Sequence, residues 1–382
     1  MRFNNQKPLV SICVTCFNSG EYIHRIIDSS LNQTYENIEV VVVDDISTDD
    51  TEKIMKEYAS RDNRVKYFRN IERLFIIKSL LRMLELAKGK FVVWPGADDW
   101  LSRDFIEKGV GNFSAHPEAA AVVPKIVSLN EVDRDKFEFS GEFGLIPGIH
   151  PREWLPKRIY KGVIATPTLF SLLRREDMIS IISYFLKNYC NDQSLPDEFR
   201  KFAQRAYGID HMYLSEILPK YENFVSDDSI RFIKITHAEN MTFGSESKNK
   251  MSDFLKAGYY DFLYLDRIYM DRFPKLVRRM RVYTGAETLG NALIYFLRSG
   301  LRPSFLDIKG SWKIISPYFS NFSAFETILV IITLIPRMIF RYLRFLHRSL
   351  IKKHKMEKNK SSAFIEENFL GYDGHFKVRN PH

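Results

Sequence analysis

Two pairs of adjacent acidic residues and one polar stretch stand out among the first hundred residues. The acids are Asp44 with Asp45 and Asp98 with Asp99, and the polar stretch is Thr-Cys-Phe-Asn at positions 15–18. Carboxylates repel phosphate groups, so a site that joins these acids with a phosphate ligand must also hold a divalent cation. The residue types therefore predict a cation-dependent phosphate site, provided that the fold brings the three places together.

The elements around these residues are short β-rich runs that alternate with segments of helical spacing. Such alternation predicts a parallel sheet with helices on both faces, in which ligands bind beyond the carboxyl ends of the strands. Each polar place directly follows a predicted strand, so we expect the three loops to converge. No glycine-rich dinucleotide fingerprint and no P-loop follows any of these strands. The predicted strands are Val10–Val14, Ile38–Val43, Val65–Phe68 and Phe91–Trp94, and the predicted helices are Tyr22–Asn32, Thr51–Ala59 and Ile76–Ala87.

The first strand also carries a C-x-x-C pair, Cys13 and Cys16. A zinc site would need a second Cys or His pair, and Cys190 has no partner at that spacing. A thioredoxin-like redox motif opens a helix, whereas these thiols fall within or at the end of a strand. We interpret them as small apolar fillers of a buried strand. The low cysteine content and the lack of a hydrophobic leader after Met1 predict a reducing compartment.

The positive charge of the chain is concentrated in one segment. Between residues 334 and 360 there are nine Lys or Arg and one acid, Glu357, which supplies +8 of the net charge of +9. This concentration argues against a nucleic-acid groove in the main domain. At helical spacing the basic residues share one face and apolar residues the other, which predicts an in-plane helix on an anionic membrane; docking on the protein's own core is the alternative. The basic residues are Arg337, Arg341, Arg344, Arg348, Lys352 and Lys355.

Two stretches of the chain, taken together, resemble glycosyltransferase family 2, which has the GT-A fold. They are VSICVTCFNSGEYIHRIIDSSLNQTYENIEVVVVDDISTDDT and AKGKFVVWPGADDW, and their motifs stand in the order and spacing of that family. The resemblance is strong from residue 8 to about 130 and extends less firmly to about 242. It implies a Rossmann-like, mostly parallel α/β sheet with helices on both faces, and an inverting transfer of a sugar from a nucleotide diphosphate.

The same resemblance implies roles for the residues of the three loops. Thr15, Phe17 and Asp45 would hold the base and ribose, Asp98 would contact the nucleotide sugar, and Asp99 would ligate Mn²⁺ or Mg²⁺ on the diphosphate. The residue types agree with these roles. An aromatic ring can stack on a base, and a carboxylate can accept a hydrogen bond from the imide N–H of uracil or thymine.

The catalytic base implied by the resemblance is Asp210, in the stretch AYGIDHMYLSEIL. A glycine before it and an apolar periodic run after it predict a helix N-terminus, which would keep the carboxylate ionised; a plain N-cap role is the alternative. His237 stands in a stretch similar to a family motif after the base and would contact the diphosphate or the metal, a structural role being the alternative. The chain departs from the family at Phe17, which lacks a tyrosine hydroxyl, at Lys234, and at 80–81, where Arg73 is a candidate substitute.

The predicted organisation has four parts. A GT-A domain covers residues 1–242, with a nucleotide-sugar half at 1–130 and an acceptor half at 131–242. A helical extension at 243–324, a basic membrane-associating helix at 325–355 and a flexible tail at 356–382 follow.

The predicted function is a metal-dependent transfer of a single sugar from a UDP- or dTDP-type donor to a glycan or lipid-linked acceptor, at the cytoplasmic face of a membrane. A catalytically silent glycan- or membrane-binding module is one alternative, although the intact acids speak against it. A sugar nucleotidyltransferase is another, and it would need a glycine-rich basic loop after the first strand.

Overall fold

The computed structural model describes residues 7–133, 136–152, 170–193, 197, 200 and 220–237. Within the first hundred residues, four parallel strands lie in the order β3-β2-β1-β4, and three helices connect them. Every helix and strand predicted for this part is confirmed, with small shifts at the ends. The strands are β1 (Val10–Cys16), β2 (Ile38–Asp44), β3 (Val65–Arg69) and β4 (Phe91–Val93), and the helices are α1 (Ile23–Leu31), α2 (Thr51–Arg61) and α3 (Phe75–Leu86).

Beyond β4 the sheet becomes mixed. Strand β9 inserts antiparallel between β4 and β6, while β6 and β10 run parallel to each other. Strand β7 pairs antiparallel with β6, and β8 and β5 pair antiparallel with β10. The elements are β5 (Trp100–Leu101), α4 (Phe105–Ala115), β6 (Ala119–Asp133), β7 (Lys136–Phe143), β8 (Gly148–Pro151), β9 (Leu172–Arg174), α7 (Arg175–Phe185), the π-helical turn η1 (Leu186–Cys190) and β10 (Asn223–Thr236).

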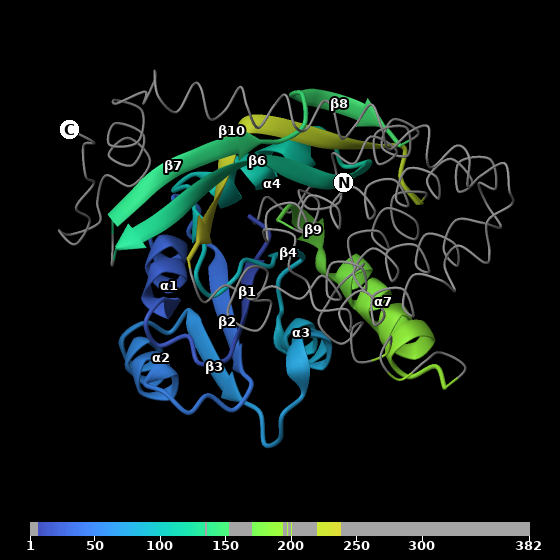
Figure 1. Cartoon of the computed structure of the whole chain (residues 1–382). Coiled ribbons are helices and arrows are strands. Elements are labelled where there is room, and N and C mark those ends of the chain that lie inside the picture. The colour runs from blue at the N-terminus through green and yellow to red at the C-terminus, as the bar shows by residue number, and fades with distance from the viewer. Residues whose placement is uncertain are drawn as a thin grey trace, which may run out of the picture. The chain divides into compact units, whose positions relative to one another are not determined.

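Helices cover both faces of the parallel strands, as the alternation predicted. Figure 1 shows α1 and α2 on one side of β1–β3 and α3 with α7 on the other. Alternate residues of β1, among them Ile12 and Val14, pack into a core cluster with Ile23 and Ile27 of α1 and Phe105 of α4. Because β1 and β2 are buried on both faces, their sequences read as continuous apolar runs instead of alternating ones.

A smaller core cluster lies beside the turn that follows β4. It packs Trp100 edge-on against Phe137, with ring centroids 5.0 Å apart, and includes residues of β6 and β10. Arg25 of α1 is fully buried next to this cluster and forms an ion pair with Glu131 of β6 at 2.6 Å. The guanidinium of Arg25 also lies 5.3 Å from the Phe137 ring centroid. These contacts join the first connecting helix to the mixed half of the sheet.

The amino ends of β1 and β4 meet at Gly89. Its backbone N–H donates to Ser11 Oγ at 2.8 Å, and Ser11 Oγ in turn donates to Glu39 Oε1 at 2.6 Å. A Cβ at position 89 would lie 2.5 Å from Ser11 Oγ and 2.6 Å from the Ser11 backbone nitrogen, a separation that folded proteins do not tolerate. Only glycine fits this junction.

No helix among the described residues is long and apolar enough to cross a membrane. The described residues from 7 to Thr236 belong to one compact unit. Three predicted features lie outside the described residues: the helical extension at 243–324, the basic helix at 325–355 and the tail at 356–382.

Candidate active site

The carboxyl ends of β1 and β2 lie side by side, since Cys16 pairs with Asp44 in parallel register. The loops that follow are tied together by side chains. The backbone N–H of Asn18 donates to Ser47 Oγ at 2.9 Å, and Asn18 Oδ1 accepts from the backbone N–H of Thr48 at 2.8 Å. The loops predicted to converge from these two strands therefore do so.

Three residues, two in these loops and one at the start of α3, adopt left-handed backbone conformations although none is glycine. Asn18 has a φ of 50°, Ile46 a φ of 64° and Phe75 a φ of 59°. Left-handed geometry at β-branched or bulky residues costs of order 1–3 kcal/mol each and is found where the surrounding structure imposes it, often at functional sites. The strain marks the same edge of the sheet as the acidic residues.

Asp44 has a structural role. It is completely buried, and its Oδ1 accepts from the backbone N–H and the hydroxyl of Ser47, at 2.8 and 2.6 Å. Its Oδ2 accepts from the hydroxyl of Tyr67 at 2.7 Å and from Arg69 Nη1 at 2.8 Å. Burial, and then the hydrogen bond to Asp44, raise the pKa of the Tyr67 hydroxyl. Four donors occupy this carboxylate, which therefore holds the β2 end and its loop in place.

Asp45 lies next to Asp44 and is also buried, but its donors come from a different loop. Its Oδ1 accepts from Asn70 Nδ2 and from the Leu74 backbone N–H, both at 2.7 Å. Its Oδ2 accepts from the Phe75 backbone N–H and pairs with Arg73 Nε, both at 2.9 Å. The loop at 70–75 thus surrounds the Asp45 carboxylate, which by the family resemblance would bind the nucleotide base.

Asn70 fixes the position of Asp45. It is only 4% exposed, and besides Asp45 its Nδ2 donates to Ser79 Oγ at 2.9 Å. Its Oδ1 accepts a hydrogen bond from Arg82 Nη1. Sequence reasoning missed Asn70 and Arg82. The partners lie 25 and 12 residues apart along the chain, and no local pattern indicates such a pairing.

Arg73 brings Phe17 and Asp45 together. The carbon of its guanidinium group lies 3.2 Å from the centroid of the Phe17 ring, and 5.5 Å from that of Phe75. Phe17 is 40% exposed, so its ring lies at the surface beside the buried carboxylate. Two of the residues predicted to hold a nucleotide base are therefore part of one contact cluster.

Thr15 and the turn after β4 are linked by Trp94. The indole Nε1 of Trp94 donates to Thr15 Oγ1 at 3.4 Å, and Thr15 is partly buried near the end of β1. Trp94 stands four residues before Asp98. The third loop therefore leaves the sheet beside the first, as predicted.

Asp98 and Asp99 form a tight turn with different exposures. Asp99 is 3% exposed, and it accepts backbone N–H bonds from Gly96 at 2.9 Å and from Ile235 of β10 at 3.2 Å. Asp98 is partly exposed. Burial, and then the charge of Asp98, raise the pKa of Asp99 to about 7, while Lys234 acts in the opposite direction.

The turn fits a divalent cation. A Cβ on Gly96 would lie 2.6 Å from Asp98 Oδ1 and 2.8 Å from Asp99 Oδ2, so oxygens of both carboxylates converge on the space that this glycine leaves open. Hard oxygen ligands of this kind suit Mg²⁺ or Mn²⁺, which take further ligands from water and phosphate. Among the described residues no cluster of three or more His, Cys, Asp or Glu could hold a metal.

Lys234, where the chain departs from the family, and His237, a predicted site residue, lie at the end of β10. Lys234 is partly buried, with its ammonium 5.3 Å from the Phe170 ring centroid. His237 follows β10 directly and is partly buried. Its predicted contact with the diphosphate or the metal stays a prediction. Asp210, the predicted catalytic base, lies outside the described residues.

The three cysteines are buried free thiols. Burial raises the pKa of Cys13 and of Cys16, and that of Cys190 to about 12, so each thiol stays protonated and unreactive near neutral pH. The interpretation of the C-x-x-C pair as packing is confirmed.

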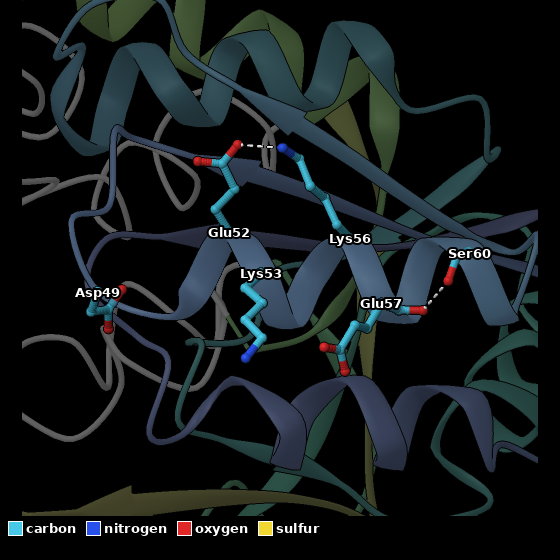
Figure 2. Close-up of a pocket in the computed structure, with 6 residues that line it drawn as sticks. All are labelled: Asp49, Glu52, Lys53, Lys56, Glu57 and Ser60. Atoms are coloured by element: carbon cyan, nitrogen blue, oxygen red, sulfur yellow. Dashed lines mark hydrogen bonds and ion pairs between the residues drawn. The ribbon is translucent and has the colours of Figure 1, made fainter.

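A surface hollow that is lined mainly by charged side chains lies on α2. Figure 2 shows its lining, in which Glu52 and Lys56 form an ion pair at 2.7 Å on successive turns of the helix. Asp49 at one end accepts from the backbone N–H of Gly20 at 2.8 Å. We assign no function to this charged, open surface. The remaining lining residues are Lys53, Glu57 and Ser60.

The fold and the loops at its carboxyl edge define a GT-A domain. In solved structures, residues 1–349 of S. aureus TarS have a similar fold, both in complex with UDP (TM-score 0.54) and in complex with UDP-GlcNAc (TM-score 0.53). Each is 16% identical in sequence; the match covers 87% of this chain and 86% or 87% of the TarS chain. Residues 11–176 match the model of glycosyl transferase family 2, and this part of the chain is a family 2 glycosyltransferase domain.

Curated relatives match shorter stretches of the chain than the family model does. An uncharacterized glycosyltransferase of Haemophilus influenzae is 41% identical over 101 residues, which are 26% of this chain and 31% of the relative. The glycosyltransferase GlyA of Streptococcus pneumoniae serotype 4 is 34% identical over 98 residues (26% of this chain, 14% of GlyA). Chondroitin synthase of Escherichia coli is 33% identical over 115 residues (30% and 17%). This chain thus spans less than a third of the length of each.

Proposed function

We propose that the protein transfers a single sugar from a nucleotide-diphosphate sugar to a hydroxyl of a glycan or lipid-linked acceptor. The observation that carries this proposal is the pairing of two subsites on one sheet edge. Phe17 and Asp45 offer an exposed ring and a carboxylate for a base, while Asp98 and Asp99 converge beside Gly96 where a cation and a diphosphate would lie. The relatives named above are glycosyltransferases, and TarS binds UDP-GlcNAc.

The proposed reaction is an inverting displacement. Asp210 removes the proton from the acceptor hydroxyl, and the hydroxyl oxygen attacks C1 of the donor sugar. The bond between C1 and the diphosphate oxygen breaks, and the nucleoside diphosphate leaves with the electron pair. Asp98 and Asp99 would hold the cation, which when bound neutralises the charge that develops on the diphosphate. We favour a UDP- or dTDP-sugar, because the imide N–H of these bases suits a carboxylate such as Asp45.

The experiment is a panel of nucleotide sugars incubated with the full chain, with Mn²⁺ or with chelator, and with membrane extract as a source of acceptor. Release of nucleoside diphosphate is followed for wild type, Asp98→Asn and Asp210→Asn, with Asp50→Asn as a matched control at an exposed position. We expect cation-dependent release from one donor, lost in the first two variants and retained in the control. Binding of nucleotide without release from any donor would overturn the transferase proposal in favour of a silent binding module.

We further propose that the acceptor lies at the inner face of an anionic membrane. The support is the basic face of residues 337–355 in the sequence. Sedimentation with phosphatidylserine vesicles tests it in the full chain. Changing Arg341, Arg344 and Arg348 to Gln should release the protein, whereas the same number of changes at Arg61, Lys53 and Lys56 of α2 should not. Retention of the first variant on the vesicles would overturn the membrane proposal and leave the transferase proposal intact.

A further inference from the structure

Arg73 makes the two contacts that the proposed function assigns to a nucleotide base. Its planar guanidinium lies on the face of Phe17, with its carbon 3.2 Å from the ring centroid, and its Nε lies 2.9 Å from Asp45 Oδ2. A base bound in this site would stack on the same ring and donate to the same carboxylate. The arginine and the base cannot occupy this place together.

The hydrogen bonds to Asp45 show that its carboxylate has no acceptor position to spare. A carboxylate has about four lone-pair positions, two on each oxygen. Asn70 and the Leu74 backbone N–H use those of Oδ1, while the Phe75 backbone N–H and Arg73 use those of Oδ2. A base N–H can therefore bind Asp45 only if one of these four donors leaves.

Arg73 is the donor that can leave at the lowest cost. Asn70 is 4% exposed and is held by Ser79 and Arg82, so its amide cannot turn away without breaking those bonds. The N–H groups of Leu74 and Phe75 belong to the backbone where α3 begins, and moving them would shift the helix. The side chain of Arg73 is 40% exposed and rotates about several single bonds, so water can replace its contacts.

We propose that Arg73 is a placeholder for the nucleotide base and thereby sets the affinity and base specificity of the donor site. This inference rests on the proposed function. When a nucleotide binds, its base takes the place of the guanidinium on Phe17, and one base N–H takes the place of Nε on Asp45 Oδ2. The cost of displacing Arg73 is subtracted from the binding free energy of every nucleotide.

The placeholder also selects among bases. Displacement of Arg73 opens one acceptor position on Asp45, while the other three stay filled. Uracil and thymine present a single imide N–H, which this position satisfies. Guanine presents two neighbouring donors, N1–H and the N2 amino group, and leaving one of them without a partner weakens binding. The site therefore suits a uridine or thymidine nucleotide and disfavours a guanosine nucleotide.

The test is equilibrium binding of UMP, UDP and GMP to the full chain by calorimetry, in chelator, for wild type, Arg73→Ala and Arg73→Lys. Arg61→Ala is the matched control, because Arg61 is an exposed arginine that also pairs with a carboxylate, Glu57. Exposed ion pairs and cation–π contacts are each worth up to about 1 kcal/mol, so we expect Arg73→Ala to bind UMP about 3- to 10-fold more tightly. Arg73→Lys keeps the charge but loses the planar stack, so its affinity for UMP should lie between those of wild type and Arg73→Ala.

The gain in affinity of Arg73→Ala should be equal for UMP and UDP, because it arises at the nucleotide base and not at the diphosphate. Weaker or unchanged UMP binding in Arg73→Ala, with wild type binding normally, would overturn the placeholder and show instead that Arg73 holds the donor. Tighter binding of GMP than of UMP by wild type would overturn the base selection. A folded wild type that binds no nucleotide, with a folded Arg73→Ala that also binds none, would overturn the proposed function itself.

Discussion

The two acidic pairs of the site differ in how the protein balances their charge. Asp44 and Asp45 are buried beside two arginines, Arg69 and Arg73, and their oxygens are filled by short hydrogen bonds. Asp99 receives two backbone N–H groups, yet its pKa rises to about 7 because it is buried next to Asp98. The first pair is compensated from within the chain. The second carries a charge that a cation would relieve, and this contrast separates a pair that the chain itself neutralises from a candidate cation site.

The largest expected effect tests the second pair. Asp98→Asn removes one of two carboxylates beside Gly96 and should lower Mn²⁺-dependent kcat/KM by about 10²- to 10³-fold. It should leave the unfolding midpoint unchanged or raise it, because Asp98 is partly exposed and its charge opposes ionisation of Asp99. Activity assays and urea unfolding of the same preparation check both parts. A loss of stability with retained activity would break the comparison.

The first pair should show the opposite behaviour. Asp44→Asn places an amide donor opposite Ser47, Tyr67 or Arg69 within a buried cluster, and should lower the free energy of unfolding by about 2–4 kcal/mol. Glu52→Gln is the control, because Glu52 also pairs with Arg69, at 3.0 Å, but is much more exposed. Urea unfolding should show little change in the control. An equal loss in both variants would mean that Arg69, and not the buried carboxylate, dominates the cluster.

The effect of Mn²⁺ on thermal stability is a smaller effect that tests the same difference between the two acidic pairs. A ligand that binds only the folded state at 100 times its Kd stabilises it by about 2.7 kcal/mol. Adding Mn²⁺ should therefore raise the melting temperature of wild type by several degrees, and chelator should reverse the shift. Asp44→Asn should keep this shift and Asp98→Asn should lose it. An equal shift in Asp98→Asn would place the metal elsewhere.

The smallest effect concerns one hydrogen bond of the compensated pair. Tyr67→Phe removes the hydroxyl that donates to Asp44 Oδ2 at 2.7 Å, and should lower the free energy of unfolding by about 0.5–1.5 kcal/mol. The matched variant is Tyr58→Phe, which removes a hydroxyl that donates to Asp28 at the same distance, away from the acidic pairs. A larger loss in Tyr58→Phe would contradict the view that Asp44 organises this edge.

Sequence patterns predicted the parallel half of the fold well, because hydrophobic periodicity reports local structure directly. The mixed half escaped prediction beyond a general acceptor region, since the order β9-β6-β10 depends on pairings between distant segments. Strand β2 continues through Asp44, one residue past the predicted end. That extension places Asp44 in the sheet and leaves Asp45 as the first residue of the loop, which explains why neighbouring acids have different roles.

The site was predicted in part. The grouping of Phe17 with Asp45, and the closeness of Thr15 to the turn at 94–99, followed from the rule for parallel sheets. The occupation of Asp45 by Arg73 could not be predicted, because it depends on side-chain geometry between residues 28 positions apart. Nor did the sequence indicate that Asp99 is more buried than Asp98. The next residue, Trp100, enters the small core cluster and draws its neighbour inward.

Gly89 has a consequence for how motifs of this kind are interpreted. It belongs to the AKG stretch that contributed to the family resemblance, yet it lies where β1 and β4 begin, at the edge of the sheet remote from the acidic loops. A glycine is required at this position because there is no room for a methyl group beside Ser11. A catalytically dead descendant of this domain would have to keep Gly89 and Ser11 while losing Asp98. The AKG stretch therefore reports how the sheet is assembled, whereas the carboxylates beside Gly96 report whether the proposed cation site is intact.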